Sequence, residues 1–296
     1  MIETRRLRTL RAVADHGTVT AAAAALHLTP SAVSQQLGAL EHEVGHRLFV
    51  RDGRGVRLTA VGRIMVAHAD EILAQLERAE AEVAAYATGA AGEVVVASFA
   101  TAIAAVLALA VRTLRETSPG LQVRVRDAEG DQSLTMLLDG AADLAIAVEY
   151  RGAPDDQRLT RVSLYAEPFD LVLPAGHPHS GSLADLSGEV WIGPHPGNPV
   201  HDVIVVACER AGFTPDFVHS SDDFRAVVAL VGAGAGVALV PRLALRDLDL
   251  TGVEVRRAAG PERRVFAAVR RGAEHHPLLR PILLTLDAIA ADLIPS

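Results

Sequence analysis

Residues 18–40 decide the fold of this chain, and they read TVTAAAAALHLTPSAVSQQLGAL. From the proline onward, apolar residues recur at steps of four, three and four, which places them on one face of a helix: Val33, Leu37, Leu40 and Val44. The opposite face carries small or polar side chains, namely Ser31, Ser34, Gln35 and Gly38. The alanines at 21–25 are small enough for a second helix to cross them closely. The stretch predicts two short helices joined by a tight turn, with one polar face left open to a partner.

Two residues specify where the second helix starts. The Thr29 hydroxyl can cap the first turn, and Pro30 suits the first helical position because its missing N–H would be unpaired there. Serine and glutamine side chains can read base edges in the major groove of DNA. We therefore expect a DNA-reading helix with five candidate contacts: Thr29, Pro30, Ser31, Ser34 and Gln35.

Residues 47–59, RLFVRDGRGVRLT, contain two short apolar runs separated by a turn-forming segment. This pattern predicts a small hairpin, which would be the wing of a winged helix-turn-helix domain over residues 1–59. Arg51, Arg54 and Arg57 would lie on the wing, where arginine can reach DNA phosphates. The plainer alternative is a solvated three-helix bundle with a basic loop. The agreement of helix pair, cap, polar face and basic hairpin argues against it.

Charge is divided unevenly along the chain. Residues 1–62 contain eight arginines and five acidic residues, whereas the 296-residue chain contains 28 basic and 36 acidic residues and has a net charge of −8. A basic end on an acidic body orients a protein on a polyanion and keeps the body away from it. Double-stranded DNA is therefore the expected partner of the N-terminal part.

Residues 60–89 contain no proline and read as one long linker helix. One narrow stripe recurs at steps of three and four, and its central members are Met65, His68, Ile72, Leu76, Ala79 and Val83. Such a stripe suits a helix that pairs with a copy of itself, so we expect dimerisation here. Packing of the stripe against the protein's own body is the alternative.

From residue 92 onward, predicted strands and helices alternate. EVVVAS, LQVRVRD and DLAIAVEY read as buried strands with helical patterns between them, and a second alternation begins at FDLVLP. Alternation of this kind predicts an α/β fold with a parallel, Rossmann-like sheet and helices on both faces.

We expect residues 92–296 to form two subdomains. The first would combine 92–165 with 266–296, and the second would take 166–265, with connecting strands near Ala166 and Val265. A cleft between two halves of this kind is a common small-molecule site, and the halves can close on a ligand.

Composition excludes several classes of protein. The single cysteine, Cys208, rules out an internal disulfide and a cysteine-rich zinc site. The charged start does not resemble a signal peptide, and no apolar run is long enough to span a bilayer, so we expect a cytoplasmic protein without membrane contact. No Ser/His/Asp or paired-carboxylate set can be assembled from the sequence. We therefore expect no enzyme, no metal and no cofactor.

The whole chain resembles a LysR-type transcriptional regulator. The most specific segment is AAAAALHLTPSAVSQQLGALEHEVGHRLFVRDGRGVRLTAVG, residues 21–62, and LVLPAGHP and GAGVALVPRLA resemble the family less specifically. The resemblance implies a winged helix-turn-helix, a linker helix and a periplasmic-binding-protein-like effector domain in two halves. It also implies homodimers through the linker helix, dimers of dimers, and a small effector that alters DNA bending or contact with RNA polymerase.

For the effector, the resemblance points to the loop after the first strand and to two helix starts in the second subdomain. The residues concerned are Ser98, Phe99, Thr101, Asn198, His201, Asp222 and Phe224. Hydroxyls and free N–H groups at a helix N-terminus suit an anionic group, while an acidic residue such as Asp222 suits an amine. The alternative reading is that the polar members are ordinary helix caps.

Three classes of protein compete at this point: an effector-responsive DNA-binding regulator, a cytoplasmic small-molecule-binding protein, and an enzyme on a two-subdomain α/β scaffold. The binding-protein reading leaves residues 1–62 unexplained. The enzyme reading lacks a catalytic set. The regulator reading accounts for all parts of the chain.

Overall fold

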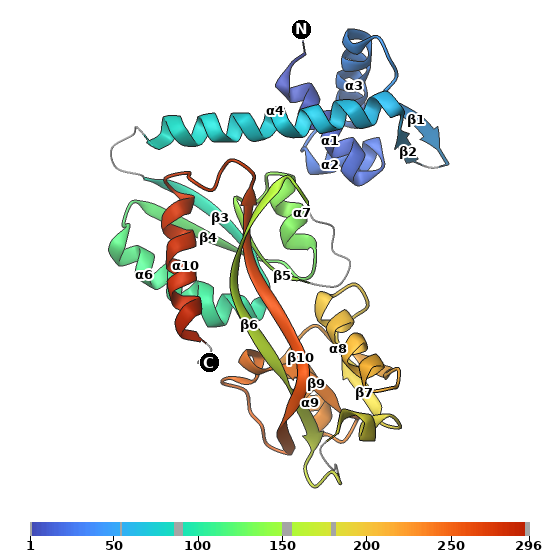
Figure 1. Ribbon diagram of the computed structural model, residues 1–296, viewed down its shortest axis with the longest axis vertical. Coiled ribbons are helices and arrows are strands. Elements are labelled where there is room, and N and C mark those ends of the chain that lie inside the picture. The colour runs from blue at the N-terminus through green and yellow to red at the C-terminus, as the bar shows by residue number, and fades with distance from the viewer. Residues whose placement is uncertain (1, 54, 86–90, 150–155, 179–181, 294–296) are drawn as a thin grey trace.

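The computed structural model describes residues 2–53, 55–85, 91–149, 156–178 and 182–293. The chain begins with three helices and a hairpin. The helices are α1 (Thr4–His16), α2 (Val19–Ala25) and α3 (Pro30–Val44), and the hairpin pairs β1 (Phe49–Asp52) with β2 (Gly55–Leu58) in antiparallel register. Leu10, Val33 and Leu40 are fully buried at the centre of this domain. The expected winged helix-turn-helix is confirmed (Figure 1).

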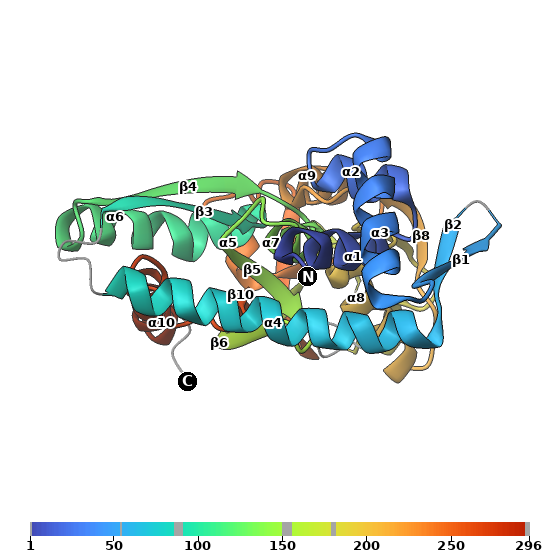
Figure 2. The ribbon, with the colours of Figure 1, turned by 90° about the horizontal axis from the view of Figure 1, so that it is seen from above.

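One long helix, α4 (Ala60–Ala85), leads away from the hairpin and passes over the rest of the molecule (Figures 1 and 2). The Thr59 hydroxyl caps it by accepting a hydrogen bond from the Gly62 N–H at 2.9 Å. A Cβ on Gly62 would come within 2.1 Å of the Leu48 carbonyl oxygen, so only glycine fits where the helix leaves the domain.

The rest of the chain is built on a six-stranded sheet with the strand order β4-β3-β5-β10-β6-β9. The strands are β3 (Gly92–Ser98), β4 (Leu121–Asp127), β5 (Leu144–Glu149), β6 (Leu159–Pro174), β9 (Ala238–Pro241) and β10 (Val253–Arg270). β3 is parallel to β4 and β5, but β10 is antiparallel to β5 and β6, and β6 is antiparallel to β9. The sheet is therefore mixed, and the prediction of a parallel sheet was wrong. The reason is that the chain crosses between the two halves twice, through β6 and β10, which run in opposite directions.

Helices cover both faces of the sheet in the first subdomain. They are α5 (Ala100–Ala102), which continues through a π-helical turn (Ile103–Leu107) into α6 (Ala108–Thr117), then α7 (Gln132–Leu138) and α10 (Leu279–Leu293). Leu144, Ile146 and Val148 of β5 face the core shared with α6 and α10, while Ala145 and Ala147 face Leu137 of α7. Alternate residues of one strand thus serve opposite layers, as the pleat of a strand requires.

The second subdomain adds a small parallel pair, β7 (Val190–Gly193) with β8 (Asp216–Ser220). Its helices are α8 (Pro199–Arg210) and α9 (Phe224–Gly232), with short 3-10 turns at Leu183–Leu186 and Arg242–Leu245. Trp191 is fully buried at its centre, and the indole N–H donates to the Leu186 carbonyl at 3.3 Å. This subdomain has a core of its own.

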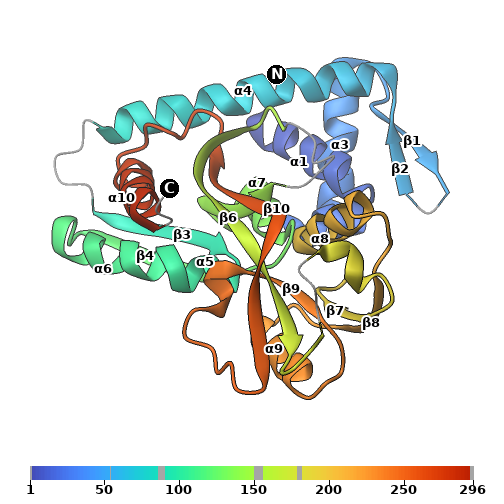
Figure 3. The ribbon, with the colours of Figure 1, turned by 60° about the horizontal axis from the view of Figure 1, so that its bottom comes forward.

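Two long strands join the subdomains. β6 and β10 run side by side through both halves, with Ala166 opposite Arg264 at the middle (Figure 3). The register of this pair shifts between Val265 and Phe266, and such irregularities bend and twist a strand locally. The connection between the two subdomains therefore lies where the paired strands β6 and β10 bend.

The N-terminal domain rests on the first subdomain through polar side-chain contacts. The Arg158 guanidinium lies 2.7 Å from Asp15, and His16 Nε2 lies 3.0 Å from Asp139 Oδ1. In the described part of the chain, no helix combines the length and the apolar character needed to cross a membrane.

Candidate functional site

The polar face of α3 is open to solvent. Ser31, Ser34 and Gln35 are exposed. Thr29 caps the helix, because its hydroxyl accepts a hydrogen bond from the Ala32 N–H at 3.2 Å, and it also lies 3.1 Å from the Ser31 hydroxyl. Pro30 occupies the first turn. The residues expected to read DNA thus share one accessible surface, while Val33, Leu37 and Leu40 lie buried behind it.

The hairpin carries exposed arginines beside this surface. Arg51 is exposed on β1, and Arg57 on β2 donates from Nε to the Asp52 carboxylate at 3.2 Å. Both partners of that pair are largely exposed, so the pair contributes little stability and can exchange for phosphate contacts. Arg54, the third expected phosphate contact, lies outside the described residues.

The stripe on α4 and the face that packs on the protein are different. The buried face consists of small and medium side chains, namely Val66, Ala69, Ala74 and Ala81. On the stripe, Ile72 is 45% and Val83 72% exposed, while His68 and Ala79 are exposed and Leu76 is half-buried. Met65 packs partly against the core of the N-terminal domain. Most of the expected seam therefore remains available to a second copy.

A cavity of about 600 Å3 lies between the two subdomains. Five of the residues expected to bind an effector line it, from both walls: Phe99, Thr101, Asn198, Asp222 and Phe224. The apolar part of the lining adds Val148, Val200 and Leu243. The geometry thus brings together segments that lie far apart in the sequence, as the prediction of two subdomains requires.

Ser98 and His201 do not line this cavity. Ser98 is the last residue of β3 and is completely buried, and its hydroxyl donates to the Phe99 carbonyl at 3.4 Å. His201 lies in the first turn of α8, turned away from the cavity, with its ring 4.8 Å from that of Phe217. The alternation of side chains along β3 directs Ser98 into the core, and the position of His201 on α8 directs its ring toward Phe217 instead of into the cleft.

A buried ion pair supports the cleft wall behind Thr101. Arg263 and Glu167 pair with each other while almost fully buried. Glu167 also accepts a hydrogen bond from the Leu243 N–H at 2.9 Å. Arg263 donates to the Thr101 hydroxyl at 2.7 Å, and its guanidinium lies 4.9 Å from the centre of the Phe99 ring. This pair was missed in the sequence analysis, because the partners lie 96 positions apart. The sign that could have revealed it is the presence of charged residues within otherwise apolar strands.

Carboxylates from both walls meet in the cleft. Asn198 Nδ2 donates to Asp222 at 3.1 Å and to Glu129 at 3.5 Å. Glu129 also accepts a hydrogen bond from the Ala100 N–H at 3.4 Å. Burial raises the pKa of the Glu129 carboxyl, and the charges of Asp127 and Asp222 add to the rise. Glu129 was not singled out from the sequence, since it follows a strand without any recognisable motif.

The alternative interpretation, that the polar residues expected to bind the effector are ordinary helix caps, applies to only some of them. Asn198 does cap α8, with its side-chain oxygen accepting from the Val200 N–H at 3.0 Å. In α9 the cap is Asp223, which accepts from the Arg225 N–H at 2.8 Å. Asp222 instead accepts from the His195 N–H at 3.0 Å. Asn198 therefore serves as cap and cleft residue together.

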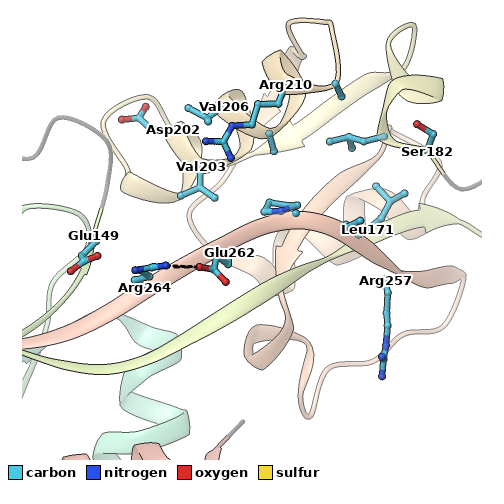
Figure 4. A pocket seen from close by; sticks show the side chains of 17 residues that line it. Glu149, Leu171, Ser182, Asp202, Val203, Val206, Arg210, Arg257, Glu262 and Arg264 are labelled. Atoms are coloured by element: carbon cyan, nitrogen blue, oxygen red, sulfur yellow. Dashed lines mark hydrogen bonds and ion pairs between the residues drawn. The ribbon is translucent and has the colours of Figure 1, made fainter. Parts of the chain in front are cut away.

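A second cavity, of about 760 Å3, lies at the second subdomain (Figure 4). It is formed mainly by α8 and the middle of β10, where Arg210 faces the cavity and Arg257 points away from α8. Arg264 at its edge pairs with Glu262 at 3.2 Å. Little of this lining comes from the first subdomain, so closure of the two halves would not enclose a ligand there.

Two family profiles match the chain. The profile described as "Bacterial regulatory helix-turn-helix protein, lysR family" matches residues 4–63, and "LysR substrate binding domain" matches residues 87–288. The HTH-type transcriptional regulator YnfL of Escherichia coli (strain K12) is 30% identical over 251 residues, covering 81% of this chain and 82% of the relative. TcbR of Pseudomonas sp. (strain P51), another HTH-type transcriptional regulator, is 32% identical over 248 residues, covering 81% and 83%.

Solved structures agree with this fold along the whole chain. A full-length OxyR variant from Pseudomonas aeruginosa superposes with a TM-score of 0.68 at 22% identity, covering 100% of this chain and 99% of that one. Full-length CbnR in complex with its target DNA superposes with a TM-score of 0.56 at 27% identity, covering 98% and 100%.

Proposed function

Because the chain belongs to the LysR family of DNA-binding transcriptional regulators, we propose that α3 reads its operator and that a small molecule in the cleft between the subdomains controls the outcome. The observation that carries this proposal is the pairing of two accessible surfaces in one chain. One is the polar face of α3, and the other is a cavity of about 600 Å3 between the two subdomains.

For DNA, we assign base reading to α3 and phosphate contacts to the hairpin. Ser31, Ser34 and Gln35 present hydroxyl and carboxamide groups from one exposed face, and Thr29 with Pro30 fixes the start of the helix. A rigid, capped helix places such groups reproducibly against base edges. Arg51 and Arg57, with Arg54 as an expectation from sequence, supply the sequence-independent part of the affinity.

For the effector, we assign the cleft residues that line the cavity from both walls, with Phe99 and Thr101 on one side and Asn198, Asp222 and Phe224 on the other. A ligand that touches both walls binds the closed arrangement more tightly than an open one, which is the requirement for a ligand-driven shift between states. Among the described residues, the lining of the cavity includes no serine, cysteine or histidine, and we propose binding without turnover.

For assembly, we propose a homodimer through the exposed stripe of α4, with pairs of dimers on longer operators. Exposed apolar side chains such as Ile72 and Val83 on a helix of 26 residues support self-pairing. Two reading domains in one particle would bind two half-sites as a unit. We also propose that the protein acts in the cytoplasm, where bacterial DNA lies, and that it contacts RNA polymerase there.

The proposal is tested with the full-length protein and genomic DNA. We expect it to select discrete fragments from sheared genomic DNA. A thermal-shift screen of metabolites should then find compounds that raise its melting temperature, because a ligand specific for the folded state stabilises it. Such a compound should change the footprint on the selected fragment. Selection of fragments without any common sequence, or turnover of the stabilising compound, would contradict the proposal.

A further inference from the structure

We propose that the cleft takes a small amine, whose protonated nitrogen lies between the carboxylates of Glu129 and Asp222. This inference rests on the proposed function, because it assumes that the effector binds in this cleft, and it adds the chemical class of the ligand. It reverses one expectation from the sequence, namely that the start of the helical segment after β3 receives an anionic group.

The place where an anion would bind is already filled by the protein. Glu129 accepts the hydrogen bond of the Ala100 N–H, at the start of the helical segment. The Thr101 hydroxyl, the other group expected to hold an anion, receives a hydrogen bond from Arg263 at 2.7 Å. An incoming carboxylate would have to displace Glu129 and would meet its negative charge.

Arg263 lines the cavity, but its charge is already paired within the protein. Its side chain is 1% exposed, and Glu167, which is fully buried, neutralises it. Arg225 and Arg246 also line the cavity, from the second subdomain. They suit the carboxylate of an amino acid, which would then span the cavity with its ammonium group at Glu129 and Asp222. The apolar lining around Phe99 and Phe224 suits a hydrocarbon part.

The carboxylates come from opposite walls. Glu129 belongs to the first subdomain and Asp222 to the second, and the Asn198 side-chain nitrogen donates to both, so they lie close to one another. Two like charges that face each other in a partly desolvated cleft repel. Burial is the main cause of the raised pKa of Glu129, and the charges of Asp127 and Asp222 add to it. A cation between them replaces the repulsion by two ion pairs. Such a ligand therefore favours closure of the two halves.

The cation is organic and not a metal ion. Within the part of the chain that the structure describes, no three His, Cys, Asp or Glu side chains are grouped so as to hold a metal. An ammonium group needs fewer fixed ligands, since it donates three hydrogen bonds to whichever oxygens surround it. Glu129, Asp222 and the nearby Asp127 supply such acceptors.

The test uses three probes of one shape and different charge: benzylamine, benzyl alcohol and benzoate. Binding to the full-length protein is measured by calorimetry and thermal shift up to about 10 mM, where weak fragment binding is visible. We expect benzylamine to bind at least tenfold more tightly than the other two probes. Glu129→Gln and Asp222→Asn should each remove most of this preference. The matched control is Glu116→Gln, an exposed carboxylate on α6, which should leave it unchanged.

One further variant separates failure of the amine class from failure of the cleft. Ala104 is exposed and lines the cavity, so Ala104→Trp should fill the space and block every probe, whatever its charge. Preference for benzoate or benzyl alcohol that Ala104→Trp abolishes would overturn the amine and leave the cleft as the effector site. Benzylamine binding that survives Ala104→Trp would overturn both. Absence of binding by all three probes would overturn the amine class.

A second inference rests on different contacts: we infer that α7 carries the state of the cleft to the DNA-reading domain. Glu129, in the cleft, precedes α7 by three residues, and Asp139 follows directly at its other end. Asp139 Oδ1 lies 3.0 Å from His16 Nε2, at the end of α1. Figures 1 and 3 show α7 between the sheet and the N-terminal helices. One helix of seven residues, about 10 Å long, thus spans the distance.

The far end of α7 is also tied to the linker helix. Arg270 donates to the carbonyls of Leu137 and Ala142 at 3.2 and 2.9 Å, and from Nε to Glu77 of α4 at 3.0 Å. Leu137 of α7 packs against three small side chains, Ala145, Ala147 and Ala268, and against the ring of Phe266. Packed helices can move by small shear displacements, and the three alanines leave few side chains that interlock with α7. A displacement of Glu129 would then shift the contacts that the far end of α7 makes with α1 and, through Arg270, with α4.

This coupling is tested by a double-mutant cycle on DNA affinity, with a genomic fragment selected by the wild type as probe. Glu129→Gln should change the affinity at least threefold in the wild-type background, and the change should vanish when Asp139→Ala cuts the contact with His16. Glu116→Gln with Asp139→Ala is the control pair, because Glu116 is an exposed carboxylate of α6 that does not line the cavity. Effects of Glu129→Gln and Asp139→Ala that multiply within about twofold, or no effect of Glu129→Gln, would overturn the coupling. Failure of the wild type to bind any fragment would instead contradict the proposed function.

Discussion

The guanidinium of Arg158 lies 2.7 Å from the carboxylate of Asp15, and this contact joins the start of β6 to the end of α1. Arg158 also pairs with Asp156 at 2.6 Å. Burial would lower the pKa of Arg158, but the hydrogen bond with Asp156 and the charge of Asp15 raise it above its usual value. The N-terminal domain is therefore held against its own effector domain by a charged contact that water reaches only partly.

The first prediction concerns this contact. Arg158→Gln should loosen the N-terminal domain on the first subdomain, because Asp15 loses its cross-domain partner while the contact of His16 with Asp139 remains. We expect faster amide exchange in α1 and a larger radius in small-angle scattering, with a loss of stability of about 1 kcal/mol. The matched control is Arg124→Gln, which breaks the exposed pair with Glu93 inside one domain. Equal exchange of α1 in both variants would show that the contact does not hold the domains together.

The second prediction concerns base reading by Gln35. Its side chain is exposed on the polar face of α3, and glutamine can pair with adenine through two hydrogen bonds. Gln35→Ala should weaken binding to the selected operator by roughly 1–3 kcal/mol and leave binding to a scrambled duplex almost unchanged. Gln122→Ala, on the distant strand β4, serves as control. The same loss on both duplexes would remove Gln35 from base reading.

The third prediction concerns the hairpin. Arg51 is exposed on β1, beside α3, and is expected to neutralise one phosphate. Arg51→Ala should weaken binding to all sequences alike and reduce the slope of log affinity against log salt by about one. Titrations at several salt concentrations measure this slope. A slope equal to that of the wild type would place Arg51 outside the interface.

The fourth prediction concerns assembly. Ile72→Asp combined with Leu76→Asp would place two unpaired charges in the expected seam of α4 and should split the dimer. Operator affinity should fall with it, because two half-sites are no longer bound as a unit. Ala67→Asp, an exposed position of the same helix outside the stripe, should leave the dimer intact. Light scattering that reports a dimer of the folded double variant would move the interface elsewhere.

The fifth prediction concerns pH. Burial, with the charges of Asp127 and Asp222, raises the folded-state pKa of Glu129, against the opposing effects of the Ala100 N–H and Arg263. Such a carboxyl stabilises the fold below its unfolded pKa, and the contribution is lost as pH rises through the folded value. Glu129→Gln should therefore gain in melting temperature relative to the wild type as pH rises above the usual glutamate pKa of about 4.3. A constant difference between the two proteins would show that Glu129 does not titrate abnormally.

Much of the fold could be predicted because it depends on neighbours a few residues apart. The four-three-four spacing that ends at Val44 predicted which face of α3 is buried, and Thr29 with Pro30 predicted where it begins. The alternation of strands and helices predicted two subdomains. The mixed direction of the sheet could not be predicted in this way, because strand direction depends on where β6 and β10 return, and no local pattern records that.

The cleft could be predicted only in outline. Loops that follow strands and precede helices were recognisable, and Phe99, Thr101, Asn198, Asp222 and Phe224 do line the cavity. Ser98 shares the same local signature but points into the core, since one step along a strand reverses the side chain. Glu129, Glu167 and Arg263 were missed because their roles come from partners that are distant in sequence.

The shared ladder of β6 and β10 has a consequence for shortened versions of this chain. The second subdomain is inserted into the first, and β10 supplies the central strand between β5 and β6. A chain that stops before Val253 would lack this strand and α10, and would leave the facing edges of β5 and β6 unpaired. Bare edges of this kind recruit other chains. A premature stop codon shortly before that of Val253 is therefore expected to yield an aggregating or rapidly degraded product, and not a DNA-binding fragment that no longer responds to its effector.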